Sequence, residues 1–122
     1  MQQAIIVAIG GAVGALARWS LTLILNSDDL PVGTFSVNLI GSFLLGCLTF
    51  ALTQELVSEN TALALGVGLL GAFTTMSTFS VETMKMFQDG LSTNAVIYVM
   101  LTMIMCPILA LLGWHTGARF IG

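Results

Sequence analysis

Residues 66–80 read GVGLLGAFTTMSTFS and lie within a segment that has no charged side chain, residues 61–81. A helix over this segment would be about 30 Å long at about 1.5 Å per residue, enough to cross a bilayer. Glycine weakens a helix, and serine and threonine hydroxyls compete for its backbone hydrogen bonds. The stretch therefore predicts an interruption near residues 71–75, surrounded by protein or a polar cavity. An unbroken helix with back-bonded hydroxyls is the alternative.

The composition is that of an integral membrane protein. Of the 122 residues, 57% are hydrophobic and 7% are charged, and the mean hydropathy is +1.00. A soluble domain carries about 25% charged residues. Short polar connections separate four apolar spans, at residues 4–25, 32–56, 61–87 and 92–113. These spans predict an all-α membrane protein with a single four-helix transmembrane domain. We expect it in the plasma membrane, that is, the cell inner membrane.

The basic residues give almost no orientation bias. With both termini on one side, Arg119 lies on that side, and Arg18 and Lys85 lie on or near the other. Such a chain can insert in both orientations, and antiparallel copies can pair about a two-fold axis in the membrane plane. Four short helices are too few to enclose a polar pathway, so we expect a dual-topology antiparallel dimer.

Polar side chains recur at helical spacing in two other spans. Asn38 lies in the second span, with Thr34 and Ser42 one turn away on either side. An amide in an apolar helix needs hydrogen-bond partners, which it finds either in another helix or along a polar path. Tyr98 and Thr102 are one turn apart in the fourth span. Polar positions of this kind face protein or water more often than lipid.

Two charged residues lie in or beside the spans. Arg18 follows a small-residue face of the first span, which is formed by Gly10, Gly11, Gly14 and Ala15. It can extend to the headgroups or make a structural hydrogen bond, and the alternative is that it attracts anions. Glu82 is the acid nearest to a span core.

No catalytic constellation is visible, because the chain has no nucleophile–base pair and no phosphate-binding loop. We therefore do not expect an enzyme. The remaining chemistry is a polar track of hydrogen-bond donors and one aromatic ring, formed by Asn38, Ser77, Thr78, Phe79, Tyr98 and Thr102. Donors without a fixed positive charge suit conduction of a small, strongly hydrated anion. Carbonyls freed by the interruption would suit a buried monovalent cation.

Three motifs in this order resemble the Fluc (CrcB) fluoride channels. They are GGAVGALARW at residues 10–19, GTFSVNLIGSF at 33–43 and GAFTTMSTFSVE at 71–82, and the likeness covers essentially the whole chain. The resemblance implies a dual-topology antiparallel dimer with two pores and a third helix broken near the membrane midplane. It also implies passive fluoride export, which lowers cytoplasmic fluoride and confers fluoride resistance, and a structural sodium ion on the two-fold axis.

The resemblance also assigns roles residue by residue. The sodium-binding backbone carbonyls fall on Gly71 and Thr74, the vestibule arginine on Arg18, and an acid near a pore mouth on Glu82. The fluoride-pore positions it implies are Asn38, Met76, Ser77, Thr78, Phe79, Tyr98 and Thr102.

Met76 departs from the family pattern, which has phenylalanine at this position. A thioether keeps bulk and polarizability but has no aromatic edge. Either a homodimer tolerates methionine here, which is our expectation, or the chain is one subunit of an obligate heterodimeric fluoride channel.

Two other functions compete with the fluoride channel. A small multidrug exporter would need an acid in its first span, and residues 4–25 contain none. A structural or regulatory membrane subunit without a pore of its own is the second competitor.

Overall fold

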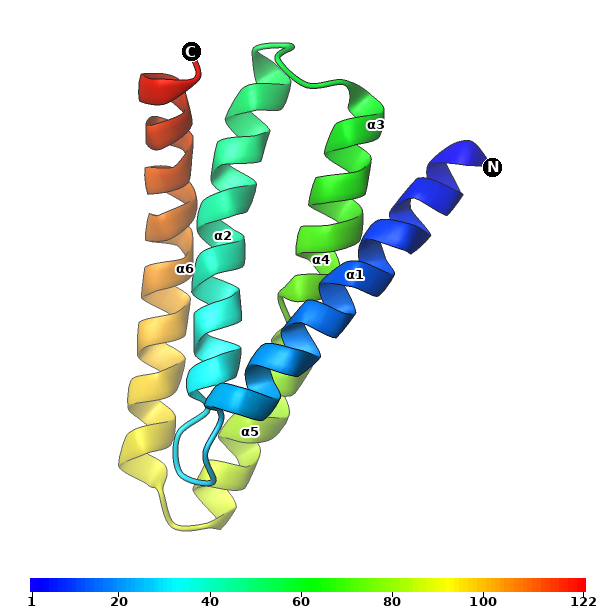
Figure 1. Ribbon diagram of the computed structural model, residues 1–122. Helices are drawn as coiled ribbons and strands as arrows, with labels where there is room; N and C mark the ends of the chain where they lie inside the picture. Colours follow the sequence, from blue (N-terminus) through cyan, green and yellow to red (C-terminus); the bar gives the residue numbers. More distant parts are fainter.

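The computed structural model describes all 122 residues, and every regular element is helical (Figure 1). Four helical stretches are long and apolar enough to cross a membrane: Gln2–Leu25, Val32–Thr53, Glu59–Gln88 and Ser92–Phe120. The chain is all-helical with four apolar helices, as predicted, but the second helix ends at Thr53 and not at residue 56.

The fourth span is longer than its sequence pattern indicated, because helix α6 (Ser92–Phe120) continues past Gly113. Gly113 is buried, and a Cβ atom there would overlap the carbonyl of Phe43 in α2 (Val32–Thr53). This glycine permits close helix packing and does not end the helix. α6 also continues through Pro107 without a break, although proline removes one backbone hydrogen bond.

Helices α2 and α6 lie side by side, whereas α1 (Gln2–Leu25) crosses the third span obliquely (Figure 1). At the crossing, Gly10 and Gly14 bring the α1 backbone against the third span. A Cβ atom at either position would overlap a backbone carbonyl, that of Ala64 or that of Leu69. The small-residue face of the first span therefore makes a direct backbone contact.

The third span consists of several short elements. In chain order they are α3 (Glu59–Ala62), the π-helical segment η1 (Leu63–Leu70), α4 (Gly71–Phe73) and α5 (Met76–Gln88). Thr74 and Thr75 separate α4 from α5 with extended backbone, at φ −87°, ψ 158° and φ −153°, ψ 121°. Helical backbone hydrogen bonding therefore stops at this point and starts again in α5.

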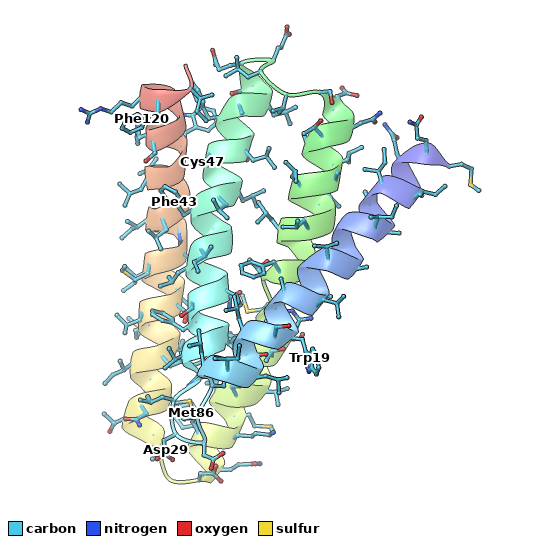
Figure 2. The ribbon with its side chains drawn as sticks, in the orientation of Figure 1. Trp19, Asp29, Phe43, Cys47, Met86 and Phe120 are labelled. Carbon is cyan, nitrogen blue, oxygen red and sulfur yellow. The ribbon has the colours of Figure 1, made fainter.

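Few residues are buried inside the single chain, 20 of 122. In the apolar window of α1 only 6% of residues are buried. Most of the large apolar side chains are exposed, as expected for helices that face lipid or a partner. The chain is thus a multi-pass integral membrane protein. One small cluster of buried side chains, Phe79, Met86, Ala95 and Tyr98, joins α5 to α6. It lies towards the end opposite the two termini, where Figure 2 labels Met86.

Candidate functional site

The Asn38 side chain holds the extended backbone between α4 and α5. Its Nδ2 donates to the Thr75 carbonyl at 3.1 Å, and its Oδ1 accepts from the Thr75 N–H at 2.8 Å. In a continuous helix the Thr75 N–H would bond to the carbonyl of Gly71. Asn38 therefore supplies the bond that the helix loses. An amide nitrogen carries two N–H donors. These two bonds use only one of them, so the second Nδ2–H of Asn38 is left over.

Thr75 also caps the helix that follows it. Its Oγ1 accepts from the backbone N–H of Thr78 at 3.2 Å and donates to Thr78 Oγ1 at 3.1 Å, and it lies 3.3 Å from Ser77 Oγ. This is an N-cap, in which a hydroxyl satisfies a free N–H of the first helical turn. The hydroxyls of Ser77 and Thr78, predicted as pore positions, are engaged in this cap.

A pocket of about 310 Å³ lies beside the extended segment. Ten residues from α2, α5, α6 and the extended segment line it: Asn38, Ser42, Thr74, Thr75, Met76, Phe79, Thr102, Met103, Cys106 and Pro107. None of these side chains carries a formal charge. The pocket therefore combines apolar walls with a few neutral hydrogen-bonding groups.

Thr102 is the unusual member of this lining. Its side chain is only 4% exposed, and its Oγ1 is buried with no hydrogen-bond partner. An unsatisfied buried hydroxyl destabilises a protein by about 1–3 kcal/mol. It is the one buried side-chain oxygen or nitrogen atom in the chain without a hydrogen-bond partner, and it belongs to a residue that lines the pocket.

The two large side chains of the α5 wall are placed differently. Phe79 is buried, and its ring centroid lies 5.0 Å from that of Tyr98. Met76 is 62% exposed on the single chain. The side of the pocket formed by Met76 is therefore uncovered.

Glu82 accepts three side-chain hydrogen bonds. Thr34 Oγ1 donates to Oε1 at 2.6 Å, Asn26 Nδ2 donates to the same oxygen at 3.1 Å, and Tyr98 Oη donates to Oε2 at 2.9 Å. Hydrogen bonds to a carboxylate are stronger than those between neutral groups. The cluster joins the α1–α2 connection, α2, α5 and α6 at one point.

A polar pocket of about 550 Å³ adjoins Glu82. The α1–α2 connection and the end of α5 line it with Asn26, Ser27, Asp28, Pro31, Glu82, Lys85, Met86 and Asp89. Figure 2 shows this end of the molecule, where Asp29 marks the connection and Met86 marks α5. A polar chamber large enough for solvent therefore lies next to the Glu82 cluster.

The carbonyls around α4 are engaged unequally. Arg18 Nε donates to the carbonyl of Ala72 at 3.0 Å. The carbonyl of Thr74 accepts no hydrogen bond, and the Thr75 N–H that would pair with Gly71 is bound to Asn38. Oxygen ligands suit hard cations, so the two carbonyls fit the donor set expected for sodium.

Comparison with known proteins places the chain in a family. Residues 5–114 match the family described as "CrcB-like protein, Camphor Resistance (CrcB)". The chain belongs to this family.

Relatives of this CrcB-family chain carry the name "Fluoride-specific ion channel FluC". The protein from Idiomarina loihiensis is 48% identical over 103 residues, covering 82% of this chain and 80% of the relative. The one from Shewanella frigidimarina is 40% identical over 117 residues, covering 93% and 94%. The one from Magnetococcus marinus is 43% identical over 115 residues, covering 91% and 94%.

The expected site residues of the CrcB-family chain lie in four places. Asn38, Met76, Phe79 and Thr102 line one pocket. Tyr98 and Glu82 meet at the carboxylate cluster. Ser77 and Thr78 belong to the cap of α5. Gly71, Thr74 and Arg18 lie at α4.

Sequence reasoning missed Asn26 and the capping role of Thr75. Both carried a signal, because asparagine and threonine are preferred where helix N–H groups need a side-chain acceptor. Thr75 lies directly before α5. Asn26, however, lies several residues before the N–H groups that it serves, outside the usual capping spacing.

Proposed function

We propose that this chain forms a fluoride-selective channel through which fluoride leaves the cytoplasm passively. Membership of the CrcB family and the names of the relatives support this function. The observation that carries it is the buried, unpaired Thr102 hydroxyl in the same uncharged pocket as the Asn38 amide. A small anion would accept hydrogen bonds from both groups.

The path proposed for fluoride joins the two polar regions of the chain. The ion enters or leaves through the polar chamber at Glu82 and passes Tyr98 and Phe79. It then reaches the Asn38 and Thr102 pocket. Along the α5 wall, the edge of the Phe79 ring offers the positive end of its quadrupole. Neutral donors bind the ion without holding it too tightly for conduction.

Passive conduction is sufficient for export. A negative-inside membrane potential drives an anion outward with about 2.3 kcal/mol per elementary charge at 100 mV. No covalent step is involved, and an ion channel is not an enzyme.

The working unit that we propose is an antiparallel homodimer in which the two copies insert in opposite orientations. Two features of the chain support this. Met76 leaves the pocket uncovered on one side. The extended backbone at Thr74 and Thr75, which we place near the membrane midplane, needs protein or a polar cavity around it inside a bilayer. A second copy would cover both.

We further propose that the two copies share a structural sodium ion. The carbonyls of Gly71 and Thr74 from each copy would hold it, and Arg18 would steady the segment through Ala72. When bound, the cation supplies positive charge near the anion path and ties the two extended segments together.

A heterodimer remains the competing assembly, and Met76 favours it. The exposed thioether stands where the family pattern has an aromatic ring, so a different homologous chain could supply the missing ring.

The test is fluoride efflux from liposomes that contain only this purified chain, followed with a fluoride electrode and with chloride as the control ion. We expect fast fluoride efflux and no chloride efflux. Absence of fluoride efflux from a well-folded dimer would contradict a self-sufficient channel and direct the search to a second homologous subunit.

A further inference from the structure

We propose that Asn26 is a positioning residue of the fluoride path, because its side-chain amide holds the carboxylate of Glu82 in place. This inference rests on the proposed fluoride conduction and adds a residue that acts on the path without contacting the ion. It derives from the position of one amide between the start of α2 and the Glu82 cluster.

The oxygen of this amide satisfies the start of α2. Asn26 Oδ1 accepts from the backbone N–H groups of Gly33 at 2.7 Å and Thr34 at 3.2 Å. The first N–H groups of a helix have no partner within the helix. Because these groups can only donate, the amide must present its oxygen to α2 and its nitrogen to the opposite side.

The nitrogen side of the amide faces Glu82. Nδ2 lies 3.1 Å from Glu82 Oε1 and 3.4 Å from Thr34 Oγ1. Thr34, which is fully buried, donates its own hydroxyl to the same carboxylate oxygen at 2.6 Å. Two donors therefore fix Oε1, and Oε2 is directed at the Tyr98 hydroxyl, 2.9 Å away.

The effect on the path passes through Tyr98. The Tyr98 ring packs against the ring of Phe79, and Phe79 lines the pocket that contains Asn38 and Thr102. If Nδ2 is lost, Thr34 is the only donor left on Oε1, so the Glu82 carboxylate and the Tyr98 hydroxyl that donates to it are held less firmly. Asn26 thus sets the orientation of groups along the path from the α1–α2 connection.

The capping and positioning roles can be separated by substitution. Asn26→Asp keeps an oxygen for the α2 N–H groups but places a second oxygen against Glu82, so the cap stays and the link is lost. Asn26→Ala removes both. Adding Glu82→Gln to Asn26→Asp reverses the polarity of the pair, since the new amide at position 82 can donate to the new carboxylate at position 26.

Fluoride efflux from liposomes is the first measurement. In the wild-type background Asn26→Asp should slow efflux about tenfold or more, as expected for loss of a hydrogen bond to a charged group. In the Glu82→Gln background the same substitution should change efflux by less than about threefold. The matched control is Asn60→Asp, an exposed asparagine in α3, which should leave efflux unchanged.

The second measurement does not depend on conduction. Amide hydrogen exchange at Gly33 and Thr34 should stay slow in Asn26→Asp and become fast in Asn26→Ala, and the thermal midpoint should recover when Glu82→Gln is added to Asn26→Asp. This readout shows whether the cap survives where efflux is lost.

Two results would overturn the proposal: wild-type efflux in Asn26→Asp, or an equal slowing by that substitution in both backgrounds. Thermal coupling of positions 26 and 82 in a wild-type chain that passes no fluoride would refute the proposed function instead, and it would leave Asn26 a purely structural role.

Discussion

Asn38 serves both the backbone and the pocket at the scale of single residues. Its amide pairs with both backbone groups of Thr75 and lines the cavity that contains Thr102. Asn38→Asp would replace the donor to the Thr75 carbonyl with an oxygen and put a negative charge in the anion path. We expect fluoride efflux to be abolished and the free energy of unfolding to fall by about 1–3 kcal/mol. Undiminished efflux would remove Asn38 from the path, and light scattering should still find a dimer.

Thr102 allows a prediction in which stability and function change in opposite directions. Thr102→Val removes a buried hydroxyl that has no partner and keeps the shape of the side chain. The free energy of unfolding should rise by about 1 kcal/mol, because the desolvated hydroxyl no longer destabilises the fold. Fluoride efflux should slow, and Thr102→Ser should retain both wild-type properties. A stabilised variant with wild-type efflux would show that this hydroxyl does not contact the ion.

The sequence identifies polar residues in apolar spans more readily than it identifies their partners. Asn38, Glu82 and Thr102 could be singled out because a polar group among apolar ones needs an explanation. Their partners lie far away in the chain: the amide of Asn38 meets the backbone of Thr75, and Glu82 meets Asn26. Such pairs depend on how the helices pack, which no local pattern encodes.

The connection between α4 and α5 acts as a structural element of its own. Thr75 caps α5 through its hydroxyl and is held through its backbone, so the two functions can be tested separately. Thr75→Ala should lower the free energy of unfolding by about 1 kcal/mol, the usual effect of losing an N-cap. Thr75→Ser should preserve stability. Chemical denaturation of both variants measures the difference, and equal stability of the two would exclude a contribution from the cap.

Element boundaries could be predicted where composition changes, and less well where packing decides. Glycines and hydroxyl residues pointed to residues 71–75, and the extended backbone lies at Thr74 and Thr75. Its depth in a membrane is still a prediction. The π-helical segment η1 was not foreseen, because π-helices are rare and have no distinct hydrophobic period. The close approach of Gly10 and Gly14 to this segment depends on tertiary contact.

For the whole molecule, the proposed dimer and its sodium ion give a further prediction. Replacing sodium with a large organic cation during purification should lower the thermal midpoint and shift the particle towards the mass of one 12.9 kDa chain. Thr74→Ala should change the thermal midpoint and the mass of the particle only slightly in the same assay. The Thr74 hydroxyl bonds back to the carbonyl of Leu70 at 3.2 Å, whereas the proposed ligand is the Thr74 carbonyl. A dimer that is indifferent to sodium would contradict the shared site.

Hydropathy was sufficient to predict four spans, because lipid demands apolar helices of a given length. Hydropathy does not indicate which helix faces pack against one another. Most large apolar side chains are exposed on the single chain, so an apolar pattern looks the same whether its face meets lipid or a second copy.

The backbone contact of α1 has a consequence for how such chains adapt to their membranes. Gly10 and Gly14 are the positions of this helix where an added Cβ would overlap a carbonyl of the third span. Most of its large apolar side chains are exposed, whereas Ile6, Val7 and Leu21 are half-buried. The size and number of the exposed side chains can follow the thickness of the host bilayer without disturbing the polar interior. Chains from organisms with differing lipids should therefore differ in the exposed apolar side chains of α1 that lie outside residues 10–19, while the two glycine positions stay small.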